Sequence, residues 1–171
     1  MQGKSEAMMD TYLLNKCLRS LQQLDEASII SFRSDGISVY PLPASHIMSR
    51  HVVQYTTMRR FITLSHSCDT SNLLHVLSNC EEMQKPVRRA EKKILNMVHG
   101  EVKYKIEGKL TSKMRVQIPW QKSFVLLQAA IGQIHLEDFT LNKEITFMVE
   151  YAVRMLKACE DYSVEGSLHG Q

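Results

Sequence analysis

The stretch Lys122–Tyr162, KSFVLLQAAIGQIHLEDFTLNKEITFMVEYAVRMLKACEDY, decides the fold, because it predicts two helices joined by a short connector. Every residue of Phe124–Ile131 except Gln128 is apolar. A helix that is apolar on all sides is stable only when protein surrounds it. Pro119 and Gly132 bracket this helix and suit a helix start and a helix end. We therefore expect the first helix to form the buried centre of a helical bundle.

The second predicted helix follows the connector Gln133–Leu141 and can be capped by Asn142. Its apolar residues recur at spacings of three and four, which predicts one stripe facing the bundle: Ile145, Met148, Val149, Ala152, Leu156 and Cys159. At 100° per residue, the opposite face gathers a different set: Lys143, Phe147, Glu150, Arg154 and Asp161.

An aromatic ring and a cation two turns apart, at Phe147 and Arg154, stand where solvent would be expected. One interpretation is that another helix or domain covers Phe147. The other is that its ring is a platform for stacking bases beside a phosphate contact. The residues alone leave both interpretations open.

Composition describes an ordinary globular protein, with 44% apolar and 23% charged residues, and a net charge of +3 is too small to identify a partner. The basic residues are unevenly distributed, since residues 85–115 hold ten Lys and Arg against three Glu. This concentration fits either an anionic partner or a solvated face. The range lacks the interleaved aromatic residues of a dedicated nucleic-acid strip.

The chain lacks the sequence motifs of common metal-binding, nucleotide-binding and catalytic sites. The four cysteines form no CxxC and the Cys and His spacings match no common zinc pattern, so we expect reduced thiols, no metal, and a cytosolic or nuclear protein. None of the seven glycines belongs to GxxxxGK[ST] or GxGxxG, and HExxH and GxSxG are absent. We expect no catalytic residues and no enzyme activity in this chain. We also expect no signal peptide, membrane span or membrane partner.

Ahead of the bundle, Asp10–Glu26 predicts an amphipathic helix, whereas residues 1–9 show no pattern. Two β-type runs, Ile29–Phe32 and Ile37–Tyr40, follow on either side of a turn at residues 33–36. A helix followed by a hairpin is the back half of a winged helix. We assign it to residues 1–43 and expect it to be structural.

Residues 44–171 then form the helical bundle. We expect a helix over Ser45–Leu64 that changes direction near Thr56, and a short helix capped by Asp69 or Ser71. A helix over Val87–Val98 should be closed by Gly100, and residues 102–106 alternate as an extended segment does. The predicted fold is mainly α: a winged-helix remnant followed by a helical bundle with one long central helix.

Four segments together resemble the helical domain that follows the winged helix in large superfamily-II nucleic-acid helicases, a domain shared with a translocon component. They are Leu18–Tyr40 with Ile47–Arg50, Tyr55–Met58 with Phe61, Val87–Asn96, and a final set comprising Lys122, Leu126–Ala129, Leu136, Asp138-Phe139, Leu141 and Ala152–Arg154. Glu91-Lys92-Lys93, Leu95-Asn96 and the Asp138–Leu141 run are most similar to the meiotic crossover helicases of the Mer-three family.

The resemblance implies an accessory region of a nuclear, ATP-dependent 3′–5′ DNA helicase that acts in meiotic recombination. ATP and Mg would bind elsewhere in the parent protein, and this chain would hold no cofactor. Its partners would be single-stranded or branched DNA, the ATPase domains of the parent helicase, and other recombination proteins. One long helix would guide the strand as a ratchet. Candidate nucleic-acid-binding residues are Phe147, Arg154, Lys143, Glu150, Arg88, Arg89, Lys92 and Lys93.

Two places depart from the family pattern. Pro43 and Ala44 replace a leucine and a glycine, which affects the docking angle of the wing, and Arg115–Gln121 with Trp120 resembles an insertion that could bind a partner. A second function therefore stays open. Related domains of spliceosomal and transcription-coupled unwindases serve as protein-docking modules.

Overall fold

The computed structural model describes residues 2–33, 38–64, 68–106 and 116–169, and this part of the chain is mainly helical, as predicted. Helices and strands follow in the order α1 (Gln2–Glu26), β1 (Ile30–Phe32), β2 (Val39–Pro41), α2 (Pro43–Arg50), α3 (Tyr55–Ile62), α4 (Thr70–Ser78), a 3-10 turn η1 (Glu81–Met83), α5 (Lys92–Glu101), α6 (Pro119–Ile131) and α7 (Phe139–His169). None of the described helices is long and apolar enough to cross a membrane.

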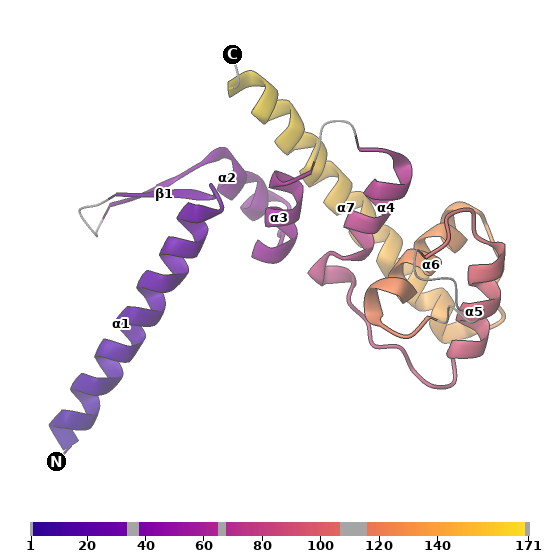
Figure 1. Ribbon diagram of the computed structural model, residues 1–171, viewed down its shortest axis with the longest axis horizontal. Helices are drawn as coiled ribbons and strands as arrows, with labels where there is room; N and C mark the ends of the chain where they lie inside the picture. Colours follow the sequence, from indigo (N-terminus) through magenta and orange to yellow (C-terminus); the bar gives the residue numbers. More distant parts are fainter. Residues whose placement is uncertain (1, 34–37, 65–67, 107–115, 170–171) are drawn as a thin grey trace.

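Helix α1 and the hairpin extend away from the other helices (Figure 1). The strands pair antiparallel with Ser31 opposite Tyr40, which confirms the predicted hairpin, and residues 34–37 of its turn lie outside the described residues. The end of α1 is joined to the sheet by the backbone N–H of Phe32, which donates to Asp25 Oδ1 at 2.8 Å. Helix α1 begins earlier than Asp10, because Ala, Met, Glu and Lys in its first turns favour a helix without an amphipathic pattern.

The prediction of a single helix over residues 45–64 is wrong, because the structure has two helices there. Residues 51–54 separate α2 from α3. Val52 sits between them at φ 51°, a left-handed conformation that is costly for a β-branched residue. Tertiary bonds on both sides hold this break. His51 Nε2 lies 2.7 Å from Asp161 Oδ2 on α7, and the N–H of Gln54 donates to Glu82 Oε1 at 2.8 Å.

Helix α4 has the predicted cap, since Asp69 Oδ1 accepts from the N–H of Asn72 at 2.7 Å. Helix α5 begins at Lys92 rather than Val87 and runs past Gly100 to Glu101, so both expected ends are wrong. The residues before Lys92 are held instead by ionic contacts described below. The alternation predicted for residues 102–106 is present in their burial, since Val102 and Ile106 are buried while Lys103 and Lys105 are exposed, but residues 102–104 form bends and the expected extended segment is wrong.

Helix α6 is the buried centre of the bundle, as predicted, and every residue from Lys122 to Ala129 is buried. The hydrogen-bonding groups of Gln128, the polar exception, are satisfied by the backbone of the segment after α5. Its Oε1 accepts from the N–H of Tyr104 at 2.8 Å, and its Nε2 donates to the carbonyl of Tyr104 at 3.1 Å. The side chain thus acts as a substitute strand partner.

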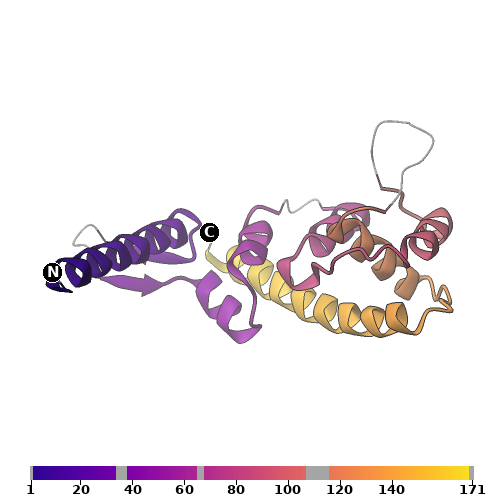
Figure 2. The ribbon, with the colours of Figure 1, turned by 90° about the horizontal axis from the view of Figure 1, so that it is seen from below.

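Helix α7 runs along the lower edge of the bundle in Figure 2, with α4, α5 and α6 above it. It begins at Phe139 rather than after Asn142, because Asp138 Oδ1 accepts from the N–H of Leu141 at 2.8 Å and so caps the first turn. Asn142 instead donates to the carbonyl of Leu136 at 2.6 Å.

The buried stripe of α7 differs in part from the predicted one. Met148 and Ala152 are buried as expected, but Val149 is 39% exposed and Leu156 37% exposed. Leu141, Met155 and Ala158 are buried in their place. The helix is therefore rotated, so that Val149, Val153 and Leu156 form an exposed apolar edge beside the core.

Candidate nucleic-acid interface

The side chains of α7 that the sequence predicted to bind nucleic acid lie on a part of the helix that no other described element covers. Phe147 is 55% exposed, and Lys143 and Glu150 are exposed as well. Lys143, Phe147, Glu150 and Arg154 follow at spacings of three and four, which places them on one side of the helix. We name this set, together with Phe139, the α7 face. None of the described segments covers Phe147, so within them the ring is available to a partner.

A second ring on the α7 face, Phe139, was missed by the sequence reasoning because it was placed in the connector. It is 71% exposed and begins the helix. Lys143 Nζ lies 4.6 Å from the centroid of its ring. The spacing Phe139, Lys143, Phe147 is a clear signal once Asp138 is recognised as the helix cap.

Arg154 lies about two turns beyond Phe147 and is half-buried. Its guanidinium carbon is 4.8 Å from the centroid of the Tyr151 ring, a cation–π contact that orients the side chain. The Nε atom is buried and has no hydrogen-bond partner in the described part of the chain. No ion pair to a described residue neutralises this arginine, so its charge stays available.

Arg88 is held in a different way from the other predicted basic residues. Its Nε lies 2.7 Å from Glu91 Oε2, and one of its terminal nitrogens lies 2.8 Å from Glu144 Oε1 on α7. Lys122, from α6, is fully buried and places its Nζ 2.6 Å from both Glu91 Oε1 and Glu144 Oε2. We name these four residues the ion cluster.

The ion cluster balances two cations with two carboxylates and joins α6, α7 and the segment before α5. Burial raises the pKa of Glu91, but the hydrogen bonds from Lys122 and Arg88 outweigh burial and leave that pKa below its usual value. Glu91 is therefore ionised, and the exposed guanidinium of Arg88 is already paired with two carboxylates. A role of Arg88 in nucleic-acid binding stays a prediction.

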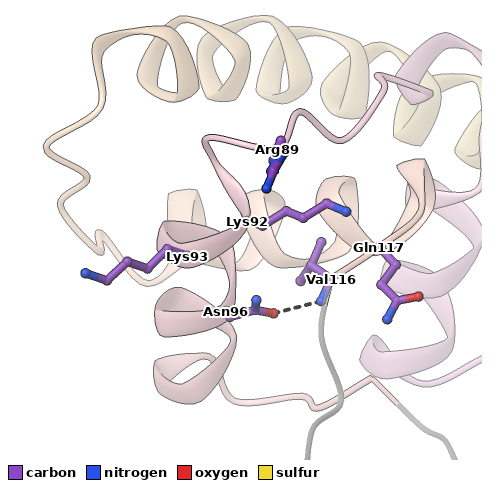
Figure 3. Close-up of a pocket in the computed structure, with 6 residues that line it drawn as sticks. All are labelled: Arg89, Lys92, Lys93, Asn96, Val116 and Gln117. Carbon is purple, nitrogen blue, oxygen red and sulfur yellow. Dashed lines mark hydrogen bonds between the residues drawn. The ribbon is translucent and has the colours of Figure 1, made fainter.

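Arg89, Lys92 and Lys93 are exposed and line a cavity of about 580 Å³ together with Asn96, Val116 and Gln117 (Figure 3). The cavity and the α7 face are separate groups. The ion pair of Arg88 with Glu144 lies between them, because Arg88 precedes Arg89 and Glu144 lies one turn from Phe147. The structure thus brings the two predicted groups to neighbouring positions without merging them.

Trp120, predicted to lie in an inserted loop, belongs to the first turn of α6. It packs on His75, at 5.5 Å between ring centroids, and on Phe124 at 6.3 Å. The ring is half-buried within the bundle and does not cover Phe147.

Cys17, Cys68, Cys80 and Cys159 are free thiols, and burial raises the pKa of Cys80 to about 12.

Curated proteins of known name resemble this chain at low identity over nearly its whole length. The rice "ATP-dependent DNA helicase MER3 homolog" is 24% identical over 168 residues, covering 92% of this chain and 14% of the relative. The human "Probable ATP-dependent DNA helicase HFM1" is 24% identical, covering 94% of this chain and 11% of the relative. The human "U5 small nuclear ribonucleoprotein 200 kDa helicase" is 25% identical, covering 94% and 7%.

The chain thus spans a small part of the length of these helicases. The model of one protein family, the Sec63 Brl domain, matches residues 41–168, which is most of the chain. The match begins at the end of the hairpin and includes every helix from α2 to α7. This protein chain belongs to the Sec63 Brl domain family.

Proposed function

We propose that this chain is the non-catalytic, strand-guiding region of an ATP-dependent DNA helicase that acts in meiotic recombination and crossover formation. The observation that carries the proposal is the open α7 face, where the exposed ring of Phe147 stands between Lys143 and Arg154. The names of the rice and human relatives support the helicase context. In such a protein the Sec63 Brl domain follows ATPase domains, which would bind ATP and Mg.

The α7 face suits a single strand for physical reasons. Rings stack on any base, and cations pair with any phosphate, so the contact is independent of sequence. Phe147 and Arg154 are seven residues apart, about 10 Å along the axis at 1.5 Å per residue, a span that a few nucleotides cover. Helix α7 is anchored to α6 by the ion cluster and to α2 by Asp161, so it can hold its position as a strand moves past.

The proposal includes a division of labour along the chain. Residues 1–43 would act as the remaining half of a winged helix and residues 44–171 as the strand-guiding bundle. ATP hydrolysis would come from elsewhere in the parent helicase, and the partners would be its ATPase domains, single-stranded or branched DNA, and other recombination proteins in the nucleus. We expect the purified chain to show no DNA-stimulated ATPase activity.

The test is a binding titration of the chain with labelled single-stranded DNA, comparing Phe147→Ala with Val164→Ala. Both substitutions remove an exposed apolar side chain of α7. Loss of stacking predicts about 1 to 3 kcal/mol weaker binding for Phe147→Ala with an unchanged salt slope, whereas Val164→Ala should bind as the parent does. Equal affinity for both variants, with folding intact, would remove the strand-guiding role.

A second candidate function is a protein-docking module, which the exposed apolar edge of Val149, Val153 and Leu156 favours. The spliceosomal relative fits this alternative as well. The two functions can be distinguished by a substitution on the apolar edge. Val153→Ser should leave DNA affinity unchanged if the α7 face guides DNA, and should weaken attachment to the ATPase domains if the apolar edge is a docking surface.

A further inference from the structure

The cavity beside α5 is lined mainly by basic and amide side chains. It measures about 580 Å³ and lies between the segment before α5, α5 itself and the residues leading into α6. Six described residues line it: Arg89, Lys92, Lys93, Asn96, Val116 and Gln117. Three are cations, two are amides and none is acidic. The electrostatic environment therefore favours an anion.

The cations of the cavity differ from Arg88 in having no carboxylate partner. Arg88 pairs with Glu91 and Glu144, whereas Arg89, Lys92 and Lys93 form no ion pair with any described residue. In Figure 3 the side chains of Arg89 and Lys92 reach into the same space, while Lys93 extends away from it. Arg89 and Lys92 are thus the two charges that an occupant would meet first.

One hydrogen bond determines which atom of Asn96 can contact an occupant of the cavity. Asn96 Oδ1 accepts from the backbone N–H of Val116 at 2.8 Å, so its acceptor atom is engaged and its amide nitrogen remains to donate (Figure 3). The cavity also lies at the first turn of α5, a 10-residue helix whose cap position, Glu91, makes no side-chain cap bond. The positive end of the helix dipole adds to the preference for an anion.

We propose that this cavity is a second phosphate-binding site for nucleic acid, distinct from the α7 face. A phosphodiester offers several acceptor oxygens to donors arriving from different directions, which matches Arg89, Lys92 and Asn96. An acidic peptide would also need apolar surface for its other side chains, and Val116 is the one apolar residue among the described residues of the lining. The proposal shares with the proposed function that the chain binds nucleic acid, but needs no strand on α7.

The two sites together imply a longer contact than α7 alone provides. Arg88 and Glu144 connect the first turns of α7 to the residue before Arg89, so a strand leaving the α7 face near Phe139 would pass this ion pair to reach the cavity. The cavity would then hold the backbone beyond the nucleotides that stack. Short oligonucleotides would occupy one site and longer ones both.

The test is a salt titration of the whole chain with labelled single-stranded DNA, in which Arg89→Gln/Lys92→Gln is compared with Lys16→Gln/Arg19→Gln on α1. All four residues are exposed, and each pair removes two positive charges. Loss of two phosphate contacts should lower the slope of log affinity against log salt by about 1.4 for a single strand, and the control pair should leave it unchanged. Equal slopes for the two double variants would overturn the proposal.

Adding Arg89→Gln/Lys92→Gln to the Phe147→Ala variant tests the cavity independently of the α7 face. If the slope still falls there, the cavity binds phosphate whatever the role of α7; if Phe147→Ala alone has no effect, only the α7 proposal fails.

Poly-glutamate identifies the class of anion. The cavity variant should bind it as the parent chain does, and a loss of poly-glutamate binding as large as the loss of DNA binding would show that the site is not a phosphate site.

Discussion

Lys122 Nζ lies 2.6 Å from Glu91 Oε1, with the lysine fully buried and the glutamate 3% exposed, so α6 carries a cation into the core that the segment before α5 neutralises. Ions this far from water are tolerated only when they are paired and hydrogen-bonded. Glu144 and Arg88 complete the arrangement.

Lys122→Met keeps the length of the side chain and removes its charge, leaving the buried carboxylate of Glu91 and the half-buried one of Glu144 with Arg88 alone. We expect unfolding by urea to show a loss of about 3 to 5 kcal/mol, the usual cost of breaking a buried ion pair. Lys157→Met is the matched control, because Lys157 is exposed on α7 and should change stability by less than about 0.5 kcal/mol. Similar stability of the two variants would contradict this account of the cluster.

Acid should destabilise the fold through Glu91. Its pKa is lower in the folded chain than in the unfolded one, so its stabilising effect is complete above the unfolded value of about 4.3 and is lost as pH falls through the folded pKa. Thermal unfolding measured from neutral pH downward should follow this course. Glu91→Gln should be less stable at neutral pH and should show a shallower loss in acid; an unchanged acid profile would assign the effect to other carboxylates.

The rotation of α7 predicts different outcomes for two apolar residues of that helix. Met155→Asp buries an unpaired charge and should unfold the bundle, whereas Val149→Asp places its carboxylate at a site that is 39% exposed and should be tolerated. Circular dichroism and urea titration measure both. Equal damage by the two substitutions would mean that a partner or a different packing covers Val149.

Arg154→Ala should weaken single-strand binding and reduce the salt slope by about 0.7, the value for one phosphate contact. Phe147→Ala, in contrast, should weaken binding without a change in slope, because stacking releases no counterions. Since Arg154 also contacts the Tyr151 ring, Arg154→Lys is the control that retains the charge. If Arg154→Ala leaves the slope unchanged, the residue is structural.

Much of the fold could be predicted because local patterns and tertiary packing agree. The apolar run of α6, the hairpin, the Asp69 cap and the alternation of residues 102–106 were each recognisable from spacing and residue type. Helix ends were less predictable. Helix α5 begins late because Arg88 and Glu91 bond to α6 and α7, which are distant in sequence.

The candidate site was predictable in part for the same reason. Spacing placed Phe147, Lys143 and Arg154 together, but could not show that Val149 and Leu156 are exposed, because a rotation of α7 by a fraction of a turn is set by packing alone. Nor could charge counting distinguish Arg88 from Arg89. Arg88 pairs with two carboxylates and Arg89 with none among the described residues, although the two arginines are adjacent in the sequence.

The substitute strand partner made by Gln128 restricts how this domain can vary. Its amide donates to and accepts from the backbone of Tyr104, so an isosteric Glu would lose the donor and Leu would leave both backbone groups unpaired. Either change would weaken the attachment of the segment after α5 to helix α6. Among related sequences, we therefore expect an amide to persist at position 128 even where its apolar neighbours exchange freely.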